Sequence, residues 1–159
     1  MNYYNTIAKS YNELHGEEQV KKAKLILQYL KVNKTDKLLD VGCGTGIATE
    51  LFNCDKTGID PSAELVKQCK FKTIVGKAEE LPFPDKSFDI VLCMTAIHHC
   101  DLDKALAEIK RIARRDVVIT VLKKLKNAQE IVGKIRKVFT VVKEVEEEKD
   151  WVVIGSLLS

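Results

Sequence analysis

Residues 38–46, with the sequence Leu-Leu-Asp-Val-Gly-Cys-Gly-Thr-Gly, constrain the fold of this chain more than any other stretch. Branched apolar residues lead into Asp40, and three glycines then alternate with small residues. This pattern predicts a buried strand, a tight turn and the start of a helix. The glycines permit positive φ angles and let a ligand approach the backbone without meeting a Cβ atom. We therefore expect a ligand-binding turn here, inside an α/β sheet.

The length and composition are those of a globular domain. The 159 residues are enough to bury a core, and 45% of them are hydrophobic and 31% charged. We expect a single domain over 1–159, made of an N-terminal helical lid over 1–32 and a core over 36–159. The net charge of +3, from 26 basic and 23 acidic residues, does not indicate a nucleic-acid partner. No apolar run approaches the roughly 20 residues that a membrane span needs, so no membrane partner is expected.

Cysteine usage indicates the compartment. The five cysteines are an odd number, contain no Cys-x-x-Cys pair and follow no signal peptide. Free thiols in a reducing cytoplasm fit this pattern better than a disulfide framework or a zinc site. We therefore expect a cytoplasmic protein that holds no metal.

Alternating strand and helix patterns run along the chain. After a break at Gly16, an amphipathic helix is expected over 17–32. Strands of the core are expected over 38–41, 56–60, 71–75, 88–94 and 117–122. Helices are expected to about residue 52 and over 61–70, 101–113 and 128–138.

The last two expected strands, 139–145 and 151–155, are joined by the acidic residues 146–150. So short a connection suits an antiparallel pair, because a parallel crossover needs a dozen or more residues. With the five earlier strands, this predicts an α/β fold. The expected architecture is a mostly parallel seven-stranded sheet with a C-terminal antiparallel hairpin and helices on both faces.

The spacing of the glycine turn narrows the choice of ligand. Gly42, Gly44 and Gly46 alternate, but an isoleucine follows, so the third glycine of the G-x-G-x-x-G dinucleotide motif is missing. The Lys-Ser/Thr pair of a phosphate-binding loop is also missing. Asp60 ends the next strand, about 20 residues after the acid before the turn, the register in which a carboxylate reaches both hydroxyls of a ribose. The alternative role for Asp60 is to cap the helix that follows.

Four motifs follow one another along the chain. They are residues 40–46, 58–62, 78–83, and 88–91 together with 96–99. In this order they resemble the class I S-adenosylmethionine-dependent methyltransferases, in particular the group called type 11. The resemblance runs from about Tyr3 to the C-terminus. It implies a Rossmann-like fold, S-adenosyl-L-methionine as cofactor, and transfer of a methyl group to an acceptor that the motifs do not identify.

The resemblance assigns cofactor-binding roles to the first two motifs. Gly42 and Gly44 would lie along the methionine portion of the cofactor, and Asp40 would lie near its ammonium group. Asp60 would hold the ribose hydroxyls.

The same resemblance implies further contacts. Ala78 and Glu79 would lie along the adenine edge, the first through its backbone. Cys93 and Met94, which end the fourth strand, would border the cofactor, and Tyr11 would cover its methionine end.

The chain departs from the family at Lys77, where an acid is common. Lysine cannot accept the adenine amino proton, so either Glu79 substitutes or the backbone and packing hold the adenine.

Two adjacent histidines follow the fourth strand. His98 and His99 would lie near the transferred methyl group, and histidine suits proton transfer near neutral pH, so both are candidate catalytic bases. The alternative is that one of them packs against or caps the helix that starts at Asp101, while the other is exposed.

The link after the fifth strand is short, and no insertion that would cover a substrate follows it. Two explanations are open: the acceptor is large, or a small activating subunit completes the pocket. A rival function is a catalytically inactive, cofactor-binding regulatory or scaffold subunit. A nicotinamide-dependent oxidoreductase is disfavoured by the missing third glycine.

Overall fold

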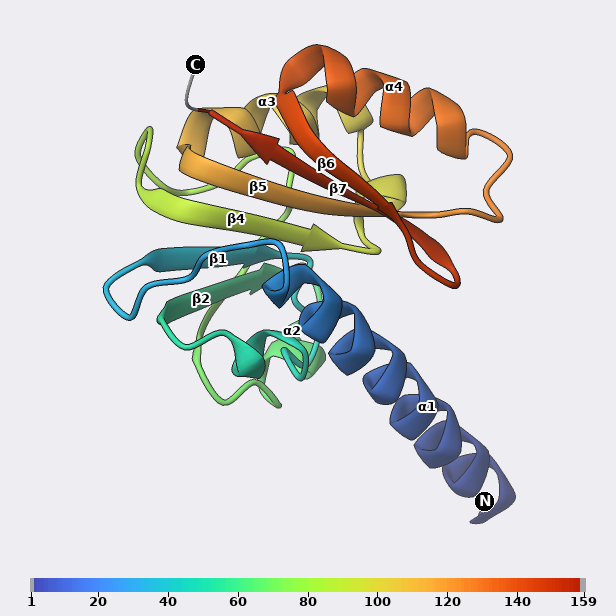
Figure 1. Ribbon diagram of the computed structural model, residues 1–159. Coiled ribbons are helices and arrows are strands. Elements are labelled where there is room, and N and C mark those ends of the chain that lie inside the picture. Colours follow the sequence, from blue (N-terminus) through green and yellow to red (C-terminus); the bar gives the residue numbers. More distant parts are fainter. Residues whose placement is uncertain (1, 158–159) are drawn as a thin grey trace.

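The computed structural model describes the backbone of residues 2–157 and the side chains of residues 14–157. Within the described residues, most strands are followed by a helix, but two pairs of strands are consecutive along the chain (Figure 1). The helices are α1 (Asn2–Leu27), η1 (Thr49–Leu51), α2 (Ala63–Val66), η2 (Ile97–His99), α3 (Leu102–Ile112) and α4 (Ala128–Val138). The strands are β1 (Lys37–Val41), β2 (Asp55–Asp60), β3 (Lys72–Val75), β4 (Phe88–Met94), β5 (Ala113–Leu122), β6 (Thr140–Glu146) and β7 (Asp150–Ser156).

All seven strands form one sheet in the order β3-β2-β1-β4-β5-β7-β6. Neighbouring strands from β3 to β5 are parallel, whereas β7 runs antiparallel to both β5 and β6. The prediction of a mostly parallel, Rossmann-like sheet that ends in an antiparallel hairpin is therefore confirmed.

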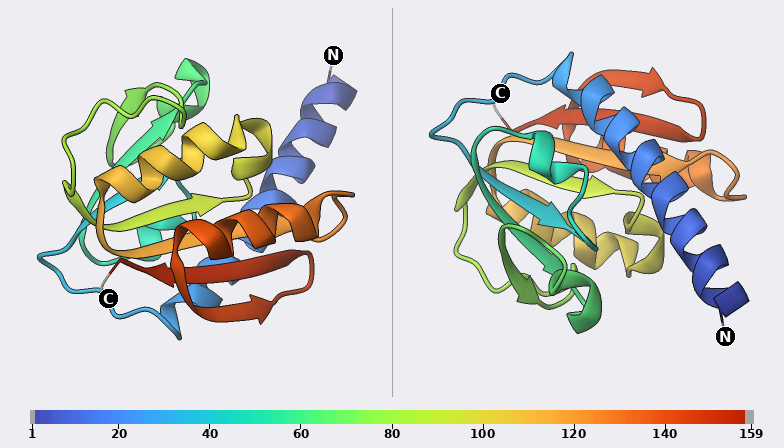
Figure 2. Two further views of the ribbon diagram at one scale, coloured as in Figure 1. Left: turned by 90° about the horizontal axis from the view of Figure 1, so that it is seen from above. Right: turned by 90° about the horizontal axis from the view of Figure 1, so that it is seen from below.

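Helices cover both faces of this sheet, as expected (Figure 2). On one face, the helical spacing of apolar residues in α3 and α4 directs a buried stripe onto the strands. On the other face lies the C-terminal half of α1, where Ala23 and Ile26 have no exposed surface. That half of α1 packs with Leu38, Ile90 and Leu92 in the core beneath the sheet. The lid role of 1–32 stays a prediction, because the side chains of residues 2–13 lie outside the described part.

The expected helix break at Gly16 is wrong, since α1 continues through it. A Cβ atom at Gly16 would lie 3.3 Å from Ile47 Cδ1, so this glycine allows the helix to pack closely against the turn after β1. The helix also ends earlier than expected, at Leu27.

The helix expected over 61–70 is shorter, because α2 ends at Val66. Ser62 caps it by accepting a hydrogen bond of 3.3 Å from the amide of Leu65. Cys69 and Phe71 leave the helical path and pack against the glycine turn, where a Cβ atom on Gly46 would lie 2.6–2.7 Å from their side chains.

Within residues 2–157, no helix combines the length and the apolar character needed to cross a membrane.

Candidate functional site

The sheet has a topological switch point at β1. The next strand in the sequence, β2, lies on one side of β1, and β4 lies on the other side. Asp40 of β1 is therefore opposite both Gly58 and Leu92. Open α/β sheets bind ligands in the crevice outside the carboxyl ends of strands at such a point. The glycine turn, Asp60 and the residues after Met94 all meet there.

The glycine turn is fixed to the end of β2 by its backbone. The amides of Gly42 and Cys43 both donate to the carbonyl of Ile59, at 2.8 and 3.1 Å. Gly42, Gly44 and Gly46 have φ angles of 75°, 54° and 72°, in the left-handed region that favours glycine.

The three glycines differ in what a side chain would meet. A Cβ atom on Gly42 would lie 2.5 Å from Ala96 Cβ, and one on Gly46 would lie 2.6 Å from Phe71. At Gly44 a Cβ atom would have nothing within 4 Å. Gly42 and Gly46 are therefore needed for packing, whereas Gly44 presents bare backbone to open space beside the turn.

Asp60 joins the turn to the start of α2. Its Oδ2 accepts a hydrogen bond of 2.9 Å from the amide of Gly44, and its Oδ1 accepts one of 2.9 Å from the amide of Ser62. The side chain is largely buried. The carboxylate of Asp60 thus organises the turn after β2 and lies beside the glycine turn. The residue that caps α2 is Ser62 and not Asp60, and the ribose role of Asp60 stays a prediction.

Asp40 is a buried acid whose side chain has a single hydrogen-bond partner among the described residues. Its Oδ2 accepts a hydrogen bond of 2.5 Å from the Thr49 hydroxyl, the bond that holds η1 against the end of β1. Burial, reinforced by the negative charge of Asp60, raises the pKa of Asp40 to about 7. A cationic group would stabilise the ionised form, so Asp40 suits the ammonium of the cofactor.

The loop after β3 carries the residues assigned to the adenine edge. Ala78 is buried, but the carboxylate of Glu79 accepts a hydrogen bond of 3.2 Å from the amide of Asp101 at the start of α3. That contact leaves the role of Glu79 toward adenine a prediction.

Arg111 of α3 holds the same loop, which sequence reasoning missed. Its guanidinium donates to the carbonyls of Leu81 and Phe83, at 2.9 and 2.8 Å. Glu108, one turn away, pairs with Arg111 and accepts a hydrogen bond from the amide of Leu81. The sequence signal was an acid and an arginine three positions apart on the polar edge of a helix.

The residues that end β4 face in different directions. Cys93 has no exposed surface and packs in the core beneath α3, where burial raises the pKa of its thiol. Met94 is half-buried and packs toward the core on the α1 side. The side chain of Tyr11 lies outside the described residues.

His98 and His99 form η2, with ring centroids 3.9 Å apart. His98 Nδ1 is buried and has no hydrogen-bond partner among the described residues. Burial, with a smaller effect of His99, lowers the pKa of His98, so its ring is neutral at pH 7.

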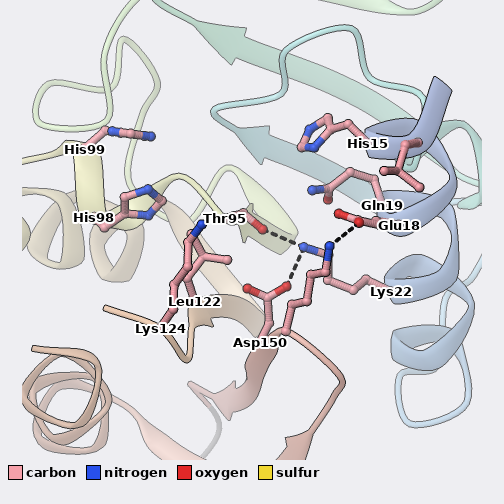
Figure 3. A pocket seen from close by; sticks show the side chains of 12 residues that line it. His15, Glu18, Gln19, Lys22, Thr95, His98, His99, Leu122, Lys124 and Asp150 are labelled. Atoms are coloured by element: carbon pink, nitrogen blue, oxygen red, sulfur yellow. Dashed lines mark hydrogen bonds and ion pairs between the residues drawn. The ribbon is translucent and has the colours of Figure 1, made fainter. Parts of the chain in front are cut away.

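A cavity of about 380 Å³ opens beside these histidines, between α1, η2, the end of β5 and the start of β7 (Figure 3). Lys22 of α1 reaches across it to Asp150 of β7, with 2.6 Å between Lys22 Nζ and Asp150 Oδ2. The same ammonium donates to Thr95 Oγ1 at 2.7 Å. Sequence reasoning missed Lys22, Thr95 and Asp150, because nothing in a single chain pairs a lysine with an aspartate 128 residues away.

No group of three or more His, Cys, Asp and Glu side chains within the described part is placed to hold a metal ion. The five cysteines are unbridged.

Comparison with known families assigns the chain. Residues 39–121, just over half of it, match the family described as a methyltransferase domain. The chain belongs to the class I S-adenosylmethionine-dependent methyltransferases. The matched segment of this methyltransferase contains the glycine turn, Asp60, the loop after β3 and both histidines.

Related sequences cover part of this methyltransferase. An uncharacterized protein of Methanocaldococcus jannaschii is 36% identical over 119 residues, which cover 72% of this chain and 47% of the relative. An uncharacterized methyltransferase of Schizosaccharomyces pombe is 34% identical over 113 residues, 56% of this chain and 39% of the relative. The chain thus spans half or less of the length of these relatives.

Solved structures resemble the methyltransferase over more of its length. A structure of the complex between the Trm112 methyltransferase activator of Haloferax volcanii and a methyltransferase contains a chain that matches with a TM-score of 0.79. The match covers 94% of both chains at 18% identity. At this identity the likeness shows the fold alone.

Proposed function

We propose that the chain is an active methyltransferase that binds S-adenosyl-L-methionine at the switch point and transfers its methyl group to an acceptor bound beside η2. The observation that carries the proposal is the arrangement of Asp40, Gly44 and Asp60. A buried acid, bare backbone and a second acid meet where the family places the methionine and ribose portions of its cofactor.

Each group of this arrangement has a binding role. Asp40 pairs with the ammonium, and the backbone at Gly42 and Gly44 passes the methionine portion. Asp60, already fixed by two amides, accepts hydrogen bonds from the ribose hydroxyls through its remaining lone pairs.

The rest of the pocket excludes water from the cofactor. Ala78 and Glu79 border the adenine, Cys93 and Met94 border the cofactor where β4 ends, and Tyr11 covers the methionine end. Much of the catalysis of methyl transfer comes from alignment and exclusion of water, which these contacts supply.

When bound, S-adenosyl-L-methionine would supply a methyl group activated by its sulfonium sulfur, and the acceptor atom that takes this methyl group would give up a proton. His98 takes that proton, because it lines the cavity and its ring is neutral at pH 7. His99 packs against His98 and helps to keep its pKa low.

Calorimetry tests the cofactor assignment. We expect binding of S-adenosyl-L-methionine and of its demethylated product, and no binding of NAD. Binding of NAD alone would refute the proposal. The rival of an inactive scaffold predicts cofactor binding without transfer, so methyl-labelled cofactor incubated with an extract of the protein's own cells distinguishes the two. Label on any extract component supports the enzyme.

We also propose that a small activating subunit binds at the β3 edge of the sheet. The similarity to a chain of the Trm112 complex supports such a subunit, as does the short link of residues 123–127 between β5 and α4. Val75 on β3 and Leu65 on α2 are exposed apolar side chains, at 55% and 39%. Val75 leads directly into the loop that borders the adenine, so a subunit here would reach the cofactor site.

The opposite edge is less suited to a partner. Strand β6 carries Lys143, Glu144 and Glu146, and charges on an edge strand discourage further pairing. Co-purification of the methyltransferase with a Trm112-type subunit tests the surface. Val75→Glu should abolish complex formation, whereas Val142→Glu, at an equally exposed valine on β6, should leave it intact. Equal complex formation by both variants would exclude the β3 edge.

Unbridged cysteines near the cofactor site support a cytoplasmic location. The thiols of Cys43 and Cys69 both donate to the carbonyl of Gly44, and neither forms a disulfide. A reducing compartment maintains this state.

A further inference from the structure

The cavity beside η2 contains a buried ion pair that is only partly satisfied. The side chains of Lys22 and Asp150 are 4% and 1% exposed. Lys22 Nζ bonds to Asp150 Oδ2 and to Thr95 Oγ1, but Asp150 Oδ1 has no hydrogen-bond partner within the described part of the chain. Both side chains line the cavity (Figure 3).

A purely structural role explains the pair poorly. A buried ion pair that only fastened α1 to β7 would give no advantage over two apolar side chains of similar size, which often stabilise a fold as well or better. A buried carboxylate oxygen without a partner is also unfavourable, and such atoms are rare in folded proteins. The free oxygen at the cavity wall therefore points to a ligand that donates a hydrogen bond.

The backbone at Thr95 gives a second, independent observation. Thr95 has a φ angle of 57°, a left-handed conformation that is exceptional for a β-branched residue. It is held there by the hydrogen bond of 2.7 Å from its amide to Thr120 Oγ1. Strained residues of this kind cluster at binding and catalytic sites, where the surrounding structure maintains them.

The cavity adjoins the cofactor turn. Ala96, the residue after Thr95, is the one that a Cβ atom on Gly42 would strike. The cavity wall and the glycine turn are therefore separated by a single residue of the β4–η2 link. His98, the proposed base, lines the cavity as well.

We propose that this cavity is the methyl-acceptor site, and that the acceptor is a small anionic molecule whose hydroxyl or amino group donates a hydrogen bond to Asp150 Oδ1. This inference rests on the proposed function and names the substrate class for it. Lys22 fixes the carboxylate through Oδ2 and so directs Oδ1 at the acceptor.

Size and charge define this class. A volume of about 380 Å³ lies at the small end of the range for small-molecule sites, which favours a small acceptor. Among the lining charges, Lys22 pairs with Asp150, and Lys149 pairs with Glu18. Lys124 also lines the cavity and has no ion-pair partner in the described part, so a positive charge is left for an acid group of the acceptor.

Methyl-labelled cofactor with separated fractions of a cell extract tests the acceptor class. We expect label in the low-molecular-mass fraction, on a product that an anion-exchange resin retains while the cationic cofactor passes through. Label only in the macromolecular fraction, or only in low-mass products that the resin does not retain, would overturn the proposal.

Variants separate a binding role from a structural one. Lys22→Met combined with Asp150→Leu removes both charges and replaces them with apolar volume, so folding is retained. We expect unchanged affinity for the demethylated cofactor and methyl transfer to the low-mass acceptor at least about tenfold slower, as for loss of a hydrogen bond to a charged group. Asp150→Asn should likewise bind the demethylated cofactor with unchanged affinity but transfer the methyl group more slowly. Asp36→Asn is the control, because its carboxylate pairs with Arg115 at the opposite end of the sheet.

A second measurement does not depend on turnover. In the complex with demethylated cofactor, nuclear magnetic resonance should show shifts of the Thr95 and Asp150 amides when the low-mass fraction is added. Transfer by the double variant within about twofold of the unmodified protein, or no shift at these amides, would leave the ion pair a structural contact only. If the protein fails to bind S-adenosyl-L-methionine at all, the proposed function itself fails, which is a different result.

Discussion

The amide of Gly44 donates a hydrogen bond of 2.9 Å to Asp60 Oδ2, which joins the glycine turn after β1 to the acid that ends β2. The two features that most strongly indicated a nucleoside-containing ligand in the sequence are thus one structural unit. Because Gly44 is also the turn glycine with open space on its Cβ side, the acid and the bare backbone border the same region. A change at either residue should affect both the turn and the ligand.

Replacement of Asp60 should therefore remove cofactor binding. Asp60→Ala loses the ribose hydrogen bonds and frees the turn, so we expect the affinity for demethylated cofactor to fall by about 100-fold or more in calorimetry. Asp60→Asn, which keeps one acceptor oxygen, should have an affinity between those of Asp60→Ala and the unmodified protein. Asp55→Ala, at the exposed start of the same strand, is the control. An Asp60→Ala affinity equal to that of the control would refute the ribose assignment.

Gly42 and Gly44 should respond differently to alanine. Both have positive φ angles, so each alanine variant carries a similar backbone strain of about 1–2 kcal/mol. Only Gly42→Ala adds a collision, with Ala96 Cβ. In denaturant unfolding, Gly42→Ala should be clearly the less stable variant. Gly44→Ala should keep most of its stability and lose cofactor affinity instead. The reverse order would mean that Gly44, not Gly42, is the packing position.

Local pattern was sufficient to predict most of the sheet. The apolar run of β4, the glycine turn and the short acidic connection between β6 and β7 together predicted a mostly parallel sheet with a C-terminal antiparallel hairpin, but not the order of its strands. The helices 17–32 and 61–70 were placed less well. Their ends depend on contacts with residues elsewhere, such as Gly16 with Ile47.

The cofactor side of the site could be predicted from the sequence because its residues fall into contiguous motifs. The acceptor side could not be predicted in this way. Lys22, Thr95 and Asp150 come from three distant segments, and each residue alone resembles an ordinary surface or turn residue. Arg111 similarly lies among other basic residues in the sequence, which does not reveal that its guanidinium binds the loop after β3.

Asp40 should make the stability of the ligand-free protein depend on pH. Its pKa is raised from 3.8 to about 7 in the folded state, so the folded protein retains a proton that the unfolded chain loses between these values. The free energy of unfolding should fall as pH rises from about 4 to 7. Asp40→Asn should remove this dependence and stabilise the protein at pH 8 by up to about 4 kcal/mol, from roughly three pKa units. Equal pH dependence in both proteins would contradict the buried acid.

Cofactor affinity should show the opposite trend. An ammonium binds the ionised form of Asp40, so affinity should increase as pH rises through about 7 and should be flat and weaker in Asp40→Asn. Titration calorimetry can measure this affinity between pH 6 and about 7.5. In that range an α-amino group stays largely protonated. A decrease in affinity over that range would exclude contact between Asp40 and the ammonium.

Arg111 should control the order of the adenine loop. Its guanidinium bridges Glu108 and Asp85 while it donates to two loop carbonyls, a planar fork that lysine cannot reproduce. Arg111→Lys should speed hydrogen exchange at the Leu81 amide and weaken cofactor binding by about tenfold, with the sheet amides unchanged.

A matched control exists on the other side of the molecule. Arg136 forms an equally bidentate pair with Glu144, yet both side chains lie at the surface between α4 and β6, away from the cofactor turn. Arg136→Lys should alter neither exchange at the Leu81 amide nor cofactor affinity, because an exposed ion pair contributes little to stability and this one lies far from the loop. If both variants bind the cofactor equally well, the loop is held by its packing around Ala78 and Leu81, and Arg111 has no part in positioning it.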